Sequence, residues 1–262
     1  MHSLPAVRSL CVVATLLAAC PVRADGLSDL KAALARLQAQ TPLKATLDVK
    51  TVERRGEGAD ASEKLGQASV GLEDGTRGLQ LLYAKDTLAR MDAESRQLVR
   101  DSKAKTPTVW ALAKLDSTEF VPMASAAPAL ARSLEESVFK SEKVDTWGGK
   151  PARLLTFMVP MSKLPEQQRK YVKEFDSTLS VWIAADGTPL ASESRAAVKG
   201  RAFVVVSFEA VDETSSTYAV LGDRLVTLRS ENHVSSSGAG EHGEQRMTKT
   251  LQPQADPLPA RP

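Results

Sequence analysis

The alternation of apolar and polar residues in the second half of this chain constrains its fold more than any other feature. Residues 177–195 read STLSVWIAADGTPLASESR, in which Asp186 and Gly187 separate two alternating segments. An Asp-Gly pair between two such segments is the typical sequence of a tight β-hairpin turn. A period of two puts successive side chains on opposite faces of a strand. The sequence therefore predicts an antiparallel hairpin with one apolar face.

Similar strand-like segments recur along the chain. A half-buried strand is predicted from Leu43, and further strands are predicted from Phe203, Ser216, Asp223 and Glu244. In total, roughly nine to eleven strands are expected from this pattern. Helices do not alternate regularly with these strands, so a parallel sheet is not expected. The prediction is an α+β fold with a single antiparallel sheet and with helices on one face.

Three segments carry helical spacing instead. Leucines recur every three or four residues in the range 27–37, which predicts one amphipathic N-terminal helix. Residues 84–140 mostly lack strand periodicity and contain Pro107, Pro122 and Pro128, which predicts a helical insertion made of short helices. The apolar residues of the range 164–175 also fall on one helical face, and we expect a helix there.

The N-terminus has the order of a secretory signal peptide. Arg8 precedes the apolar run 10–20, which is too short to span a bilayer, and small residues follow it. We predict that residues 1–24 are a signal peptide and that residues 25–251 form a single domain. The proline-rich residues 252–262 are expected to be a disordered tail.

Two cleavage sites compete at the end of this leader. Val22 and Ala24 suit ordinary cleavage, which would release a soluble periplasmic protein. Residues 17–19 before Cys20 instead resemble a lipobox, and cleavage there would give a membrane-anchored lipoprotein lipidated on Cys20. Pro21 is atypical after a lipidated cysteine, and the linker to the first helix would be very short. We therefore favour soluble release and expect a membrane tether only if Cys20 is lipidated.

Composition excludes some classes of partner. The whole chain carries 34 basic and 32 acidic residues. Arg8 and Arg23 lie in the leader, so the mature chain has equal numbers of both signs, and binding of nucleic acid is not expected. Cys11 and Cys20 are the only cysteines, so the mature domain contains no disulfide and must be stabilised by its core.

Motifs for catalysis or cofactor binding are absent or fail in their context. GAGEHG, residues 238–243, has the letters of a dinucleotide fingerprint, but a strand-like segment follows it where that motif needs a helix. A hairpin loop is the better interpretation. His233, Glu241 and His242 are a conceivable metal set, but we expect solvated loop residues. The prediction is a non-enzymatic protein without a catalytic residue, cofactor or metal.

The apolar strand segments suggest where a ligand would bind. A sheet with helices over its mouth encloses either a filled core or an apolar cavity, and the sequence leaves both open. The candidate ligand-binding residues are the apolar ones on one strand face, namely Leu179, Val181, Ile183, Val204, Val206 and Phe208.

Several of these segments resemble the periplasmic lipoprotein carriers and sorting proteins of the Lol type, and the related sensor domain of a sigma-factor regulator. The similar pieces are LSDLKAALARLQAQ, LKATLDVKTVER, WGGKPARLLTF and LSVWIAADGTPLASESR, including the pattern of Trp182, Asp186, Gly187, Pro189, Leu190 and Arg195. The resemblance implies an unclosed half-barrel whose concave apolar face binds acyl chains or an apolar partner segment. It does not extend to residues 84–140, and no binding residue is carried over.

Three functions remain open at this point. The leading hypothesis is an exported envelope protein that binds a lipid, a lipoprotein or another apolar ligand in a sheet-lined cavity. The alternative is a regulatory or sensor module that contacts another envelope protein through its sheet edge and loops. A hydrolase with an unrecognised site is the third.

Overall fold

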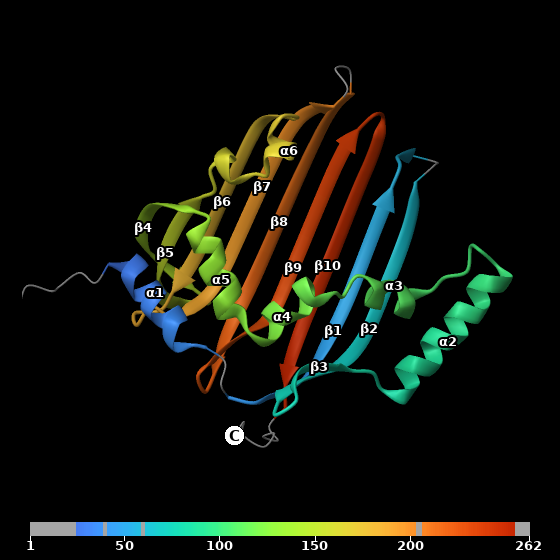
Figure 1. The fold of residues 1–262 in the computed structure, drawn as a ribbon, viewed down its shortest axis with the longest axis horizontal. Helices are drawn as coiled ribbons and strands as arrows, with labels where there is room; N and C mark the ends of the chain where they lie inside the picture. The colour runs from blue at the N-terminus through green and yellow to red at the C-terminus, as the bar shows by residue number, and fades with distance from the viewer. Residues whose placement is uncertain (1–24, 39–40, 59–60, 203–205, 255–262) are drawn as a thin grey trace, which may run out of the picture.

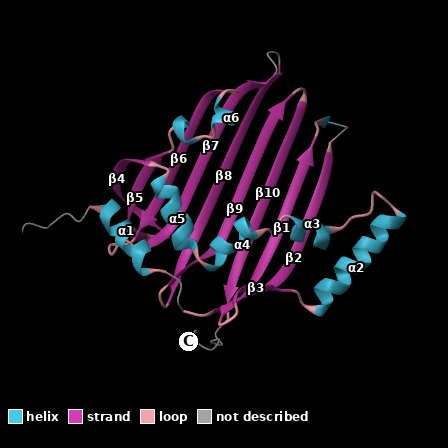
Figure 2. Ribbon diagram, in the orientation of Figure 1, coloured by secondary structure: helices cyan, strands magenta, loops and turns pink. Residues whose placement is uncertain are grey.

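The computed structural model describes residues 25–38, 41–58, 61–202 and 206–254 and shows one ten-stranded antiparallel sheet (Figures 1 and 2). From edge to edge the strands lie in the order β3-β2-β1-β10-β9-β8-β7-β6-β5-β4. The first and last strands of this order are edges, so the sheet is unclosed. Helices pack on one of its faces, which confirms the predicted α+β class.

The described residues form ten strands and six α-helices. The strands are β1 (Leu43–Arg55), β2 (Ser62–Gly75), β3 (Gly78–Leu82), β4 (Val138–Trp147), β5 (Lys150–Met158), β6 (Val172–Ile183), β7 (Pro189–Ala202), β8 (Val206–Leu221), β9 (Arg224–Gly238) and β10 (Glu241–Pro253). The helices are α1 (Gly26–Arg36), α2 (Lys85–Arg100), α3 (Pro107–Ala113), α4 (Ser117–Ala124), α5 (Ala126–Glu135) and α6 (Glu166–Arg169). None of these helices is both long enough and apolar enough to cross a bilayer.

The helical insertion connects the two edges of the sheet. After β3 at one edge, the chain runs through α2, α3, α4 and α5 and enters β4 at the other edge (Figure 1). The strands β4 to β10 then return as a meander until β10 pairs with β1. The insertion predicted for 84–140 therefore holds four helices within 85–135, and its last residues begin β4. At the other end, β10 continues to Pro253, and residues 255–262 of the expected tail lie outside the described residues.

Two sequence expectations are corrected here. The helix expected over 164–175 is limited to Glu166–Arg169, because Val172 and Phe175 belong to β6 and pair with β7. Pairing with a neighbouring strand outweighs the local helical pattern. The long hairpin loop expected around GAGEHG is a tight turn instead. Ala239 and Gly240 have φ of 55° and 80°, as two-residue hairpin turns require, and the strands continue up to them.

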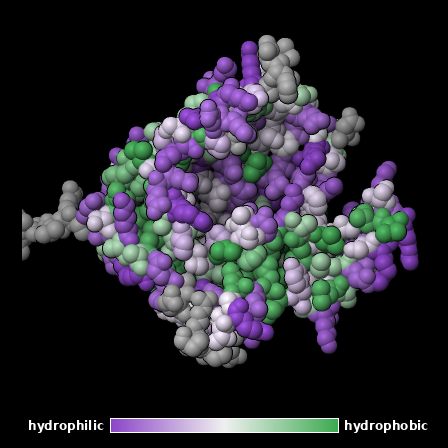
Figure 3. All heavy atoms as spheres, viewed as in Figure 1, coloured by the Kyte–Doolittle hydropathy of each residue, from purple (hydrophilic) through white to green (hydrophobic). Residues whose placement is uncertain are grey.

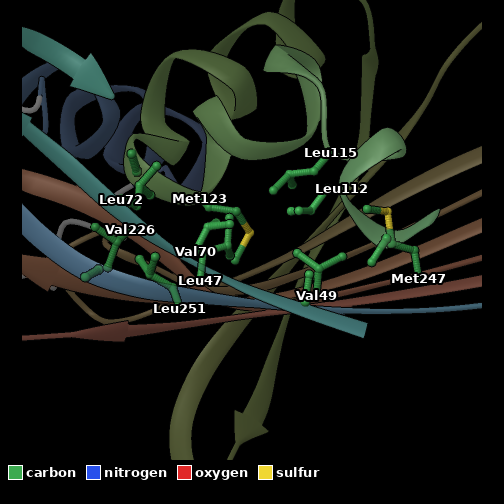
Figure 4. Close-up of a cluster of buried hydrophobic side chains, with 14 of the residues drawn as sticks. Leu47, Val49, Val70, Leu72, Leu112, Leu115, Met123, Val226, Met247 and Leu251 are labelled. Carbon is green, nitrogen blue, oxygen red and sulfur yellow. The ribbon is translucent and has the colours of Figure 1, made fainter. Parts of the chain in front are cut away.

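Apolar side chains on the helix-covered face form two separate cores. One lies under α3 and α4, where alternate residues of β1 and β2 meet residues of β9 and β10 (Figure 4). The other lies under α1 and α5 and is built on β5 and β6. We call this covered side of the sheet the helix face. Between the two cores the helix face changes from apolar to polar.

Candidate functional site

A cavity of about 370 Å³ lies between the two cores, with the middle strands as its floor and with α4 and α5 beside it. Figure 3 shows hydrophilic residues gathered in the hollow of this face, whereas hydrophobic residues gather over α4 below it. The volume lies at the lower end of the range of small-ligand pockets in proteins. We call this space the central cavity.

The floor of the central cavity consists of two rows of polar side chains that cross three strands. In antiparallel strands, residues directly opposite each other share a face of the sheet. The pairing register joins each row from β7 through β8 to β9. The first row is Ser192, Ser216 and Ser230, and the second is Ser194, Thr214 and Asn232.

Some of these groups are already bonded within the protein, and others are free. The Ser192 hydroxyl lies 2.7 Å from the Tyr218 hydroxyl, and burial raises the pKa of Tyr218, so its phenol is neutral at physiological pH. Asn232 Nδ2 donates to Thr214 Oγ1 at 3.0 Å. Within the described part of the chain, the hydroxyls of Ser194 and Ser230 have no hydrogen-bond partner. They are therefore available to a ligand.

An ion pair between a buried lysine and a half-buried glutamate lies at one side of the floor. Lys249 lies on β10 opposite Ser230, and the lysine residue is only 6% exposed. Its ammonium group donates to the Glu119 carboxylate and, at 3.2 Å, to the Glu119 main-chain carbonyl on α4. Because both partners are engaged, the pair fastens α4 to the sheet and places an acid and a base at the cavity.

The wall of the central cavity is only partly apolar, because Glu119 and Ser133 lie among its apolar residues. Met123 on α4, Leu130 on α5 and Leu179 on β6 face the space, and Met123 is 1% exposed. The cavity therefore has a polar floor and a wall with an apolar part. A ligand that fits both has one polar and one apolar side.

The residues predicted to bind a ligand are divided between core and cavity. Leu179 lines the central cavity, whereas Val181 and Ile183 are completely buried in the core under α1 and α5. Phe208 shares the helix face but lies beyond the cavity, where its ring fills the place of a side chain at Gly200. Val206 begins β8. Val204 lies outside the described residues.

A second hollow, of about 670 Å³, lies on the opposite face of the sheet. A cross-strand row of Arg195, Glu213, His233 and Arg246 runs through it. Glu213 pairs with Arg195, and the Glu244 carboxylate lies 2.9 Å from His233 Nε2 and 2.8 Å from the Arg246 guanidinium. Among the residues that the structure describes, no group of three or more His, Cys, Asp or Glu side chains is arranged to hold a metal ion. His233 and His242 are strand residues, not loop residues as expected.

Comparisons with known proteins add little to this geometry. No protein-family model and no curated protein matches the sequence. One solved structure that resembles the chain is that of MucB in complex with MucA(peri), with 11% identity over 87% of this chain and 94% of that chain. Its TM-score is 0.24, a level at which the likeness decides neither the fold nor the function of this chain.

The polar floor was missed at the sequence level, although its signal is present. Each of the segments that became β7, β8 and β9 has a pair of small polar residues two positions apart, namely Ser192 and Ser194, Thr214 and Ser216, and Ser230 and Asn232. The polar side of a strand is ordinarily read as facing water. Only the path of α4 and α5 across the sheet encloses those hydroxyls.

Proposed function

We propose that this chain is an exported binding module of the cell envelope that receives a segment of another protein in the central cavity, without catalysis. The observation that supports this is the polar floor of the cavity. An acyl chain would bury the hydroxyls of Ser194 and Ser230 without partners, which costs about 1–3 kcal/mol for each group. Main-chain amides of a polypeptide supply both donors and acceptors to such groups.

The apolar part of the wall restricts the possible occupants further. A strand or short helix with alternating sides would place apolar side chains against Met123 and Leu130 and turn its polar side to the hydroxyl rows. The proposal therefore names an amphipathic peptide segment and moves away from the purely apolar ligand of the leading sequence hypothesis. Export rests on the predicted leader 1–24.

Site-directed photocrosslinking in the native cells tests this function. A photoreactive phenylalanine analogue replaces Ser194, which is exposed at the mouth of the cavity. The matched control replaces Val144, which is 84% exposed on the edge strand β4. We expect a discrete protein adduct at position 194 and none at 144. The crosslinked peptide, mapped by mass spectrometry and then synthesised, should bind the purified protein.

The outcomes separate the three hypotheses. A lipid adduct at position 194, or lipid that co-purifies stoichiometrically in native mass spectrometry, would overturn the proposal in favour of the carrier hypothesis. Turnover of a substrate that is abolished by one substitution in the cavity, such as Ser230→Ala, would establish an enzyme instead.

A further inference from the structure

The helix α2 stands apart from the rest of the molecule. Figure 1 shows it beyond β2 and β3, at the end of the molecule opposite α1. It has 16 residues, of which only Thr87 is buried. A helix with so little burial needs another reason to be stable and to keep its direction.

Contacts along one side of α2 fix its direction. The Glu94 carboxylate accepts main-chain N–H groups of Thr108 and Val109 at 3.0 and 2.9 Å, at the start of α3. Met91 packs against the core under α3 and α4. These residues and Thr87 recur every three or four positions and so share one helix face. The opposite face of α2 does not pack against the rest of the described protein.

The free part of α2 exposes large apolar side chains. Val99 is 89% exposed, Leu88 is 50% exposed and Leu98 is 44% exposed. Figure 3 shows hydrophobic residues at the end of this helix that lies farthest from the sheet. Leu98 and Val99 occupy its last turn. We call residues 96–105 the α2 tip.

The α2 tip is basic, although the formal charges of the mature chain sum to zero. It contains four basic residues and one acidic residue, which gives a net charge of +3. Arg100, Lys103 and Lys105 are exposed, and no ion pair engages them within the described ranges. The one acid, Asp101, accepts the main-chain N–H of Lys103 at 2.8 Å. Arg96 pairs with Asp92 on α2, so Arg100, Lys103 and Lys105 are the cations that lie near the apolar pair without an ion pair in the described residues.

This combination fits a lipid surface better than a protein surface. Protein interfaces are anchored by aromatic side chains that fill pockets, and the α2 tip has no aromatic residue. Neither of the two hollows described above includes a residue of α2. Apolar side chains among basic ones are what an interfacial helix presents to anionic lipids. We propose that the α2 tip binds the surface of an anionic phospholipid bilayer.

Co-sedimentation of the mature full-length chain with vesicles tests this proposal. Vesicles of phosphatidylcholine alone are compared with vesicles containing 30% phosphatidylglycerol, a composition chosen at roughly physiological anionic content. We expect binding to the anionic vesicles only, with weakening in high salt. Each cation near the surface contributes about fivefold to the partition coefficient. The double variant Lys103→Ala with Lys105→Ala should therefore lower the coefficient at least tenfold.

The matched controls lie on β4, at the other edge of the sheet. The double variant Lys140→Ala with Lys143→Ala removes the same charge from exposed positions and should leave binding unchanged. In the same way, Val99→Asp should abolish binding, whereas Val144→Asp, at 84% exposure, should not. Unchanged far-ultraviolet circular dichroism verifies that each variant is folded.

Three results would overturn the proposal. The first is equal binding to both vesicle types, and the second is that the α2 variants bind as well as the native chain. The third is a protein adduct, captured by a crosslinker at position 99, that added vesicles do not displace. The assay does not involve the central cavity. A negative result with vesicles therefore does not contradict the proposed peptide-binding function. A negative result in crosslinking at position 194 likewise does not contradict membrane binding by the α2 tip.

Discussion

Gly187 has two separate reasons to be glycine, and they explain the Asp-Gly turn from which the fold was predicted. Its φ is +83°, which side chains rarely adopt, and a Cβ there would lie 2.3 Å from the Asp29 carbonyl oxygen on α1. The turn thus packs directly on the N-terminal helix. We predict that Gly187→Ala lowers the free energy of unfolding by at least about 3 kcal/mol, measured by urea denaturation.

Gly78→Ala is the matched control for that substitution. Gly78 has a similar φ of +77°, but a Cβ there meets nothing within 4 Å. The backbone cost alone is about 1 kcal/mol. Equal losses for the two variants would show that contact with α1 does not constrain Gly187.

Asp186 gives the same turn a dependence on pH. The Thr188 main-chain N–H, followed by the Thr188 hydroxyl and Arg36, holds the pKa of this carboxyl below its usual value. A lowered pKa in the folded state contributes stability above the unfolded value of about 3.9, and this stability is lost as pH falls through the lower folded value. We predict that the Tm difference between the native chain and Asp186→Asn is largest near neutral pH and shrinks below about pH 4. A difference that stays constant with pH would contradict this assignment.

At the level of elements, one buried arginine joins segments that are far apart in the sequence. Arg224, at the start of β9, is 0% exposed. It donates to Asp74 Oδ2 at the end of β2 at 2.9 Å, to the Ala124 carbonyl of α4 at 3.0 Å and to the Thr41 carbonyl at 2.7 Å. It therefore ties β2 and β9 to α4, the helix that borders the central cavity.

Removing this arginine should be costly because the buried Asp74 carboxylate loses its guanidinium partner. We predict that Arg224→Met destabilises the fold by about 3–5 kcal/mol, measured by urea denaturation. The double variant with Asp74→Asn should recover part of that loss, since the buried negative charge is then gone. Strict additivity of the two single substitutions would show that the pair is not coupled.

The same elements show what the sequence could and could not predict. The hairpin of β6 and β7 and the helix α1 followed from residue spacing, because each buries one face and each carries its own turn or capping residues. The range 164–175 was misread, since pairing of Val172 and Phe175 with β7 is a long-range contact that spacing does not encode. The central cavity was missed for a related reason. The hydroxyls of Ser192 and Ser194 are read as solvent-facing until α4 and α5 are known to cross them.

At the scale of the whole molecule, the polar floor of the central cavity lies between two apolar cores that stabilise the fold. One core is built on β1, β2, β9 and β10, and the other is built mainly on β5 and β6. The strands β7 and β8 connect them and carry hydroxyls where a filled core would carry apolar side chains. A polar surface kept between two closed cores is expected where binding, not stability, selects the residues.

This separation predicts that one pair of substitutions weakens peptide binding without lowering the stability of the fold. Ser194→Ala with Ser230→Ala removes the two floor hydroxyls that have no partner in the described residues, while nearly preserving volume. We expect the free energy of unfolding to stay within about 0.5 kcal/mol of the native value or to rise, because neither side chain supports a core. Affinity for the peptide crosslinked at position 194 should fall at least about tenfold, since its polar side loses two partners. Calorimetric titration and urea denaturation measure the two effects. Unchanged affinity would show that the peptide does not use the floor, and a large loss of stability would show that the floor belongs to the folding core.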